Sequence, residues 1–87
     1  RAQDWAIVGA SVLVADGDVG IGLVNMDSRP IRAAAAEAAV TSGGSAAEAA
    51  ELAPEGCEPP ADLNASADYR RHLARVLVRR GLEAAGV

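Results

Sequence analysis

Aromatic residues are scarce in this sequence, which has no Phe, one Trp and one Tyr among its 87 residues, although 51% of the residues are apolar. A chain of this length is typical of one domain, and its fold can hide only about 60 to 65% of the surface that the unfolded chain exposes. We therefore expect a single domain over residues 1–87, with one small core built from Val, Leu, Ile and Ala.

Cysteine and histidine are equally rare. Cys57 is the only thiol, so it cannot form an internal disulfide, and together with the single His72 it falls short of the three or four ligands of a zinc site. No apolar run approaches the roughly 20 residues that would span a bilayer, and the amino terminus lacks the basic-then-apolar pattern of an export signal. These absences predict a cytoplasmic chain with no metal site and no membrane span.

Lysine is absent, and all eight basic residues are Arg. Residues 1–65 hold three Arg against ten acids, a charge of -7, whereas residues 66–87 hold five Arg against two acids, a charge of +3. A net charge of -4 and the lack of aromatic residues between the arginines argue against a nucleic-acid binder. We expect the arginines to pair with acids of residues 37–62 or with a partner subunit, and we expect no nucleic-acid binding.

Two valine-rich runs, residues 6–15 and 18–26, flank Asp16-Gly17, a strong signal for a tight hairpin. The two-residue loop sets the register, which places Val14 with Val19, Val12 with Ile21 and Ala10 with Leu23 on one aliphatic face. The opposite face collects Gly9, Gly20, Gly22, Ser11, Leu13, Val24 and, with Ile7, Met26. Glycines inside strands favour either a close approach of another group or a flexible, solvent-facing side, and both interpretations stay open.

The rest of the chain is predicted to be mainly helical. Ile31-Arg32 could add a third strand, and helices are expected at about 33–41, 45–53 and 66–85, with Ser45 as a cap. In the last helix, an apolar stripe is predicted from Tyr69, Leu73, Val76 and Leu77. The aliphatic sheet face and the helices should bury each other, so the fold class is α+β: a small antiparallel sheet of two to three strands covered on one face by about three helices.

No catalytic residue emerges from the sequence. His72 and Asp68 are four residues apart, a spacing typical of a surface pair on a helix. Cys57 lies beside acids that would raise its pKa, which disfavours a reactive thiolate. The glycines of VGIGLV lie inside a predicted strand, so they do not form a phosphate-binding loop.

Three segments carry a family resemblance. RAQDWAIVGASV, IGLVNMDSRPIRAAAAEAAV and DLNASADYRRHLARVLVRRGLEAA are similar, in order, to the opening strand, the strand-to-helix segment and the closing helix of one domain. That domain is the carboxy-terminal domain of the FAD-binding medium subunit of molybdenum hydroxylases, the family of carbon monoxide dehydrogenase and xanthine dehydrogenase. The three segments cover most of the 87 residues.

The resemblance implies a role within an oxidoreductase electron relay that runs from a molybdenum cofactor through iron-sulfur clusters to FAD. The chain would be a structural and docking domain, inactive in isolation, that packs on two preceding flavin-binding domains and works with a large molybdenum subunit and a small iron-sulfur subunit. Arg1, Gln3, Asp4 and Trp5 would lie near the flavin, although Trp5 could equally anchor the sheet and Asp4 could pair with an Arg of the last helix. The alternative is a free-standing protein-interaction module without a redox role.

Overall fold

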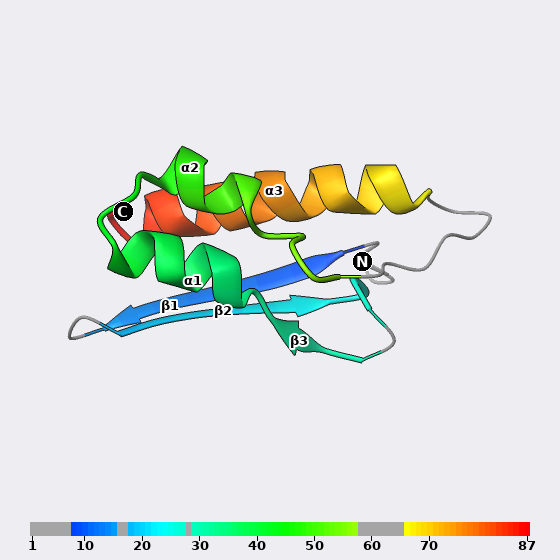
Figure 1. Ribbon diagram of the computed structural model, residues 1–87, viewed down its shortest axis with the longest axis horizontal. Helices are drawn as coiled ribbons and strands as arrows, with labels where there is room; N and C mark the ends of the chain where they lie inside the picture. Colours follow the sequence, from blue (N-terminus) through cyan, green and yellow to red (C-terminus); the bar gives the residue numbers. More distant parts are fainter. Residues whose placement is uncertain (1–7, 16–17, 28, 58–65) are drawn as a thin grey trace.

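The computed structural model describes residues 8–15, 18–27, 29–57 and 66–87, and it has an α+β architecture. Its elements follow the order β1 (Gly9–Ala15), β2 (Asp18–Val24), β3 (Ile31–Arg32), α1 (Ala34–Thr41), α2 (Ala46–Glu51) and α3 (Ala67–Ala84). The strands form an antiparallel sheet in the order β1-β2-β3. All three helices lie over the same face of this sheet (Figure 1), which confirms the predicted fold class.

The hairpin register is confirmed residue by residue. Ala15 pairs with Asp18, Val14 with Val19 and Val12 with Ile21, as the two-residue loop at Asp16-Gly17 requires. On the helix side of the sheet, Ile21 and Leu23 are each 1% exposed, so the aliphatic face enters the core. The third strand is also present, with Ile31 paired to Leu23 and Arg32 to Gly22.

The prediction that Met26 lies on the opposite face is wrong. β2 ends at Val24, and Asn25 adopts a left-handed backbone conformation with φ 63°, which Asn tolerates better than most side chains do. This conformation breaks the strand alternation, and Met26 is completely buried in the same core cluster as Ile21 and Leu23. Arg70, itself buried, donates from Nη1 to the Asn25 carbonyl oxygen at 3.4 Å, which ties α3 to this corner.

The helix layer is built largely from alanine. Ala36 of α1 and Ala49 and Ala50 of α2 are at most 1% exposed, and their small side chains let these short helices pack closely. Ser45 caps α2 as predicted, and its hydroxyl accepts from the Glu48 amide while the Glu48 carboxylate accepts from the Ser45 amide, forming a capping box. Six residues would not hold a helix alone, so α2 depends on this cap and on its packing.

The predicted apolar stripe of α3 is partly wrong. The fully buried row is Arg70, Ala74, Val78 and Leu82, at spacings of four, whereas Tyr69 is 46% exposed. Leu73 and Leu77 do pack against the core, but from its margin.

The close contact between α3 and β1 explains the shift of this buried row. A Cβ atom on Gly81 would lie 2.7 Å from Val12 Cγ2, so the helix approaches the sheet where its side chains are smallest. Large apolar residues at helical spacing therefore predicted the correct side of α3 but not its central row.

Candidate functional site

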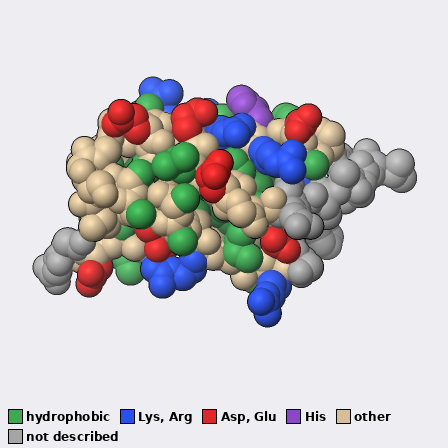
Figure 2. All heavy atoms as spheres, in the orientation of Figure 1, with side chains coloured by type: hydrophobic (Ala, Val, Ile, Leu, Met, Phe, Trp, Pro, Cys, Tyr) green, Lys and Arg blue, Asp and Glu red, His purple; other side chains and the backbone are tan. Residues whose placement is uncertain are grey.

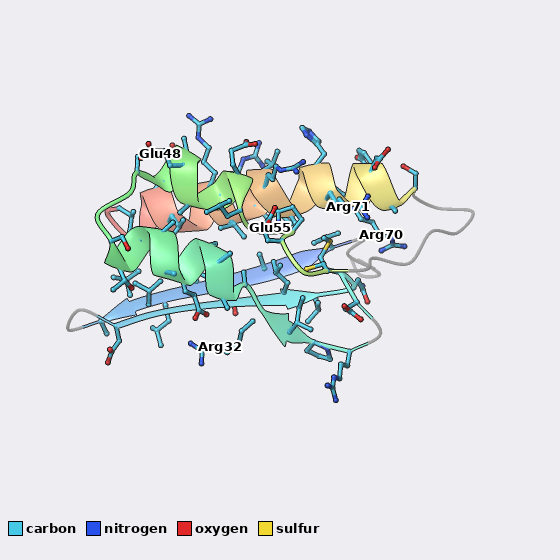
Figure 3. All side chains as sticks on the ribbon, in the orientation of Figure 1. Arg32, Glu48, Glu55, Arg70 and Arg71 are labelled. Carbon is cyan, nitrogen blue, oxygen red and sulfur yellow. The ribbon has the colours of Figure 1, made fainter. Side chains whose placement is uncertain are left out.

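The face of the sheet away from the helices is the main exposed apolar feature of the described residues. We call it the open face, and it consists of alternate strand residues: Gly9, Ser11, Leu13, Ala15, Asp18, Gly20, Gly22, Val24 and Arg32. Leu13 is 70% exposed and Val24 is 42% exposed. No described helix lies over this side of the sheet (Figure 1). Arg32 extends away from the helices at the β3 edge (Figure 3).

A groove of about 520 Å³ crosses one end of the sheet. The groove is lined by residues 9–11 of β1, 22–24 of β2 and 30–32 at β3. Gly9 and Gly22 contribute only backbone to the open-face side of this groove, so its floor is low between the Val24 side chain and Arg32. The groove is therefore shallow, largely apolar and bordered by one cation.

The glycines of the open face have different surroundings. A Cβ on Gly9 would lie 2.5 Å from Cγ2 of its cross-strand neighbour Val24, and one on Gly22 would lie 3.2 Å from Ser11 Oγ. Gly20 has no heavy atom within 4 Å of the same position. Of the two interpretations left open by the sequence, close approach therefore holds for Gly9, whose neighbour is Val24, while Gly20 faces open space.

Glu37 joins the helix layer to the sheet edge, a role that the sequence did not reveal. Its carboxylate accepts from the Ile21 amide at 2.8 Å and from Arg32 Nη2 and Nε at 2.8 and 3.1 Å. Because β3 has only two residues, the Glu37 carboxylate supplies an acceptor where a longer strand would have paired with β2. An acid in the first turn of a helix that directly follows a strand was the only available signal.

The titratable residues singled out from the sequence are not assembled into a reactive site. Asp68 accepts a hydrogen bond from Arg71 Nη1 at 2.9 Å, and His72 is exposed. Cys57 is 8% exposed, and burial raises the pKa of its thiol, with a further increase from Asp27 that Arg71 opposes. A raised pKa keeps the Cys57 thiol protonated near neutral pH and so disfavours nucleophilic chemistry.

The arginines of α3 other than the buried Arg70 are exposed or half-buried. Arg75 lies 3.7 Å from the Glu51 carboxylate and links α3 to α2, as expected for pairing with acids of residues 37–62, whereas Arg79 pairs within α3 to Glu83 at 3.1 Å. Figure 2 shows charged side chains along the helix side of the molecule and others at its lower, sheet-side margin. Exposed pairs of this kind contribute at most about 1 kcal/mol each, so this surface is mainly a solvated one.

The predicted flavin-proximal residues Arg1, Gln3, Asp4 and Trp5 lie outside the described residues. Within residues 8–15, 18–27, 29–57 and 66–87, no group of three or more His, Cys, Asp or Glu side chains could hold a metal ion. No helix in the same part of the chain is long and apolar enough to cross a membrane.

Comparison with known families gives a match over nearly the whole chain. The family model described as "CO dehydrogenase flavoprotein C-terminal domain" matches residues 1–85. No curated protein matches the chain at a significant level.

Solved structures from three bacteria resemble the chain. Carbon monoxide dehydrogenase from Hydrogenophaga pseudoflava, in a form lacking the Mo-pyranopterin moiety of its molybdenum cofactor, is 35% identical with a TM-score of 0.77, over 98% of this chain and 33% of its own. Quinoline 2-oxidoreductase from Pseudomonas putida 86 is 33% identical with a TM-score of 0.72, over 99% and 34%. Reconstituted CO dehydrogenase from Oligotropha carboxidovorans is 27% identical with a TM-score of 0.77, over 95% and 32%. The chain thus spans about a third of the length of these solved chains.

Proposed function

The chain belongs to the family of CO dehydrogenase flavoprotein C-terminal domains, and on that premise we propose that it is the carboxy-terminal structural and docking domain of the FAD-binding subunit of a molybdenum hydroxylase. In such an enzyme, electrons would pass from a molybdenum cofactor through iron-sulfur clusters to FAD. The domain would stabilise the flavin-binding part of its subunit and would not itself catalyse a reaction.

The family match over residues 1–85 carries this proposal. Two further observations support it. The solved relatives, which include carbon monoxide dehydrogenases and a quinoline oxidoreductase, hold the equivalent of this chain as about a third of a longer chain. In addition, the open face offers an apolar surface, as a domain that packs on another part of its subunit would need.

The described residues do not fit FAD as a resident cofactor. Dinucleotides are commonly held where a glycine-rich turn leads into a helix, because the backbone amides at the helix amino terminus bind the pyrophosphate. Here Gly20 and Gly22 lie inside β2, and α1 begins after an alanine rather than after a glycine-rich turn. We therefore assign the FAD to the preceding domains of the subunit, with Arg1, Gln3, Asp4 and Trp5 as the residues of this chain nearest to it.

Flavin titration tests this assignment. We expect the 87-residue chain to fold, as followed by circular dichroism, and to leave the fluorescence of added FAD unchanged. The full product of the gene that encodes Arg1 to Val87 should retain about one FAD per chain, because it would contain the domains that bind the pyrophosphate.

Two outcomes would contradict the proposal. Stoichiometric, tight uptake of FAD by the 87-residue chain would place the cofactor site within this domain. A gene product that contains no sequence before Arg1 would instead favour the free-standing interaction module.

A further inference from the structure

We propose that the open face is the surface on which the remainder of the same polypeptide packs, an inference that rests on the proposed function and specifies which side of the domain docks. The occupant would be an apolar surface of the preceding flavin-binding region. The charged outer side of the helices would then remain available to water or to other subunits.

The composition of the open face is the first argument. An antiparallel sheet with one face in water normally alternates apolar residues toward the core with polar residues toward the solvent. Here the outward residues include Leu13, Val24 and three glycines, and the two charged members, Asp18 at the hairpin end and Arg32 at the β3 edge, lie at its margin. Such a face gains from being covered, whereas the outer side of α3, with Arg75, Arg79 and Glu83, is suited to water.

The shape of the open face indicates the chemistry of its partner. The groove lined by residues 9–11, 22–24 and 30–32 can accept an aliphatic side chain that would pack beside Val24. Arg32 at the rim is 72% exposed on its side chain and already bound to Glu37, so it needs no buried counter-charge from the partner. The matching surface should therefore be aliphatic at its centre, with charges confined to its margin.

The area of the open face favours a tethered partner over a second copy of the chain. Seven residues in each of β1 and β2 and two in β3, at about 3.3 Å per residue and about 4.8 Å between strands, give an area of roughly 250 Å² per partner and about 500 Å² in total. This total is less than half of the roughly 1,200 to 2,000 Å² that stable association of separate chains generally buries, and it lies just below the roughly 600 to 1,500 Å² over which domains of one chain commonly meet. A covalent link supplies the effective concentration that so small an interface requires.

Thiol accessibility in the full gene product, purified without other subunits, tests the inference. Ser11→Cys places a thiol on the open face with almost no change of shape, and Arg80→Cys places one on the exposed outer side of α3. We expect maleimide to label the Ser11→Cys protein at least about tenfold more slowly than the Arg80→Cys protein, and both at equal rates in urea, because access controls the reaction. The wild-type protein corrects for labelling of Cys57.

A second substitution, read out at the same thiol, removes any intrinsic difference in reactivity between positions 11 and 80. Leu13→Asp should restore fast labelling at position 11, because a carboxylate in the covered interface would separate the two surfaces, whereas Leu13→Ala should restore it only partly.

The other outcomes would overturn the inference. Equal native labelling at positions 11 and 80 in a gene product that retains FAD would remove the docking face while leaving the proposed function intact. Protection that increases with protein concentration, together with a dimer mass in sedimentation, would assign the face to a second copy. A gene product with nothing before Arg1 would eliminate the occupant and the proposed function together.

Discussion

The two faces of one hairpin have opposite environments. Leu23 and Leu13 are the same residue in neighbouring strands, yet Leu23 is 1% exposed under the helices and Leu13 is 70% exposed on the open face. The covered face takes branched and long aliphatic residues, and the helix that approaches it closest does so through Gly81. The open face instead collects glycines among its strand residues. Hydrophobicity alone therefore does not determine which residues this domain buries; the pairing register does.

The largest expected effect sharpens this contrast between the two leucines. Leu23→Ala should reduce the free energy of unfolding by about 2 to 5 kcal/mol, because it removes buried methyl groups and leaves a cavity. Leu13→Ala should change it by less than about 0.5 kcal/mol, because the side chain is mostly exposed. Urea denaturation of the 87-residue chain, followed by circular dichroism, measures both. Similar losses at the two positions would mean that the open face is buried in solution.

Smaller changes in the free energy of unfolding, of opposite sign, are expected when two glycines are replaced by alanine. In Gly81→Ala, the new Cβ would lie 2.7 Å from Val12 Cγ2 and 3.2 Å from Val12 Cβ. Because the β-branched Val12 cannot easily move aside, overpacking should exceed the helix-propensity gain of about 1 kcal/mol and leave a net loss of roughly 1 kcal/mol.

The matched variant on the other face is Gly20→Ala, whose Cβ would have no heavy atom within 4 Å. It should raise the free energy of unfolding by about 0.5 kcal/mol, because alanine loses less backbone entropy than glycine in a strand. Thermal unfolding of the two variants and the wild type provides the comparison. A loss of stability in Gly20→Ala would show that the open face is packed at this position.

Local signals in the sequence predicted much of the fold. Asp16-Gly17 fixed the register because a two-residue loop permits only one pairing, and Ser45 marked the start of α2 because its hydroxyl can accept from a first-turn amide. Both depend on residues close in sequence. The same holds for Ile31-Arg32, where Pro30 punctuates the chain ahead of the strand.

The sequence-based predictions were wrong or incomplete where contacts between distant parts of the chain determine which residues are buried or bonded. Met26 enters the core only because Asn25 turns left-handed, and the buried row of α3 is set by the contact of Gly81 with Val12. Glu37 was missed because its two partners, Ile21 and Arg32, come together only when β3 pairs with β2. The glycines of the open face were noticed in the sequence, but the groove above them requires three strand ends in one place.

The smallest expected change in the free energy of unfolding concerns the helix layer alone and depends on pH. Hydrogen bonds from the backbone amide and the side chain of Ser45 lower the pKa of Glu48 below its usual value of 4.5. A carboxyl whose pKa is lower in the folded state contributes stability above its unfolded pKa, and that contribution disappears as the pH falls through the folded pKa. The wild type should therefore exceed Glu48→Gln in free energy of unfolding at about pH 7, and this difference should shrink as the pH falls below 4.5 and the Glu48 carboxylate takes up a proton.

Because Glu48 caps only α2, the loss of stability in Glu48→Gln should be confined to the helix layer. Hydrogen exchange at about pH 7 should become faster for the amides at the start of α2 while those of β1 keep their protection, since local openings can occur without global unfolding. Glu55→Gln makes the same change of charge at another exposed position and controls for net charge. A Glu48→Gln effect that stays constant from about pH 7 to pH 3, or that spreads equally to β1, would mean that the capping box does not hold α2 and that the covered face is maintained by alanine packing alone.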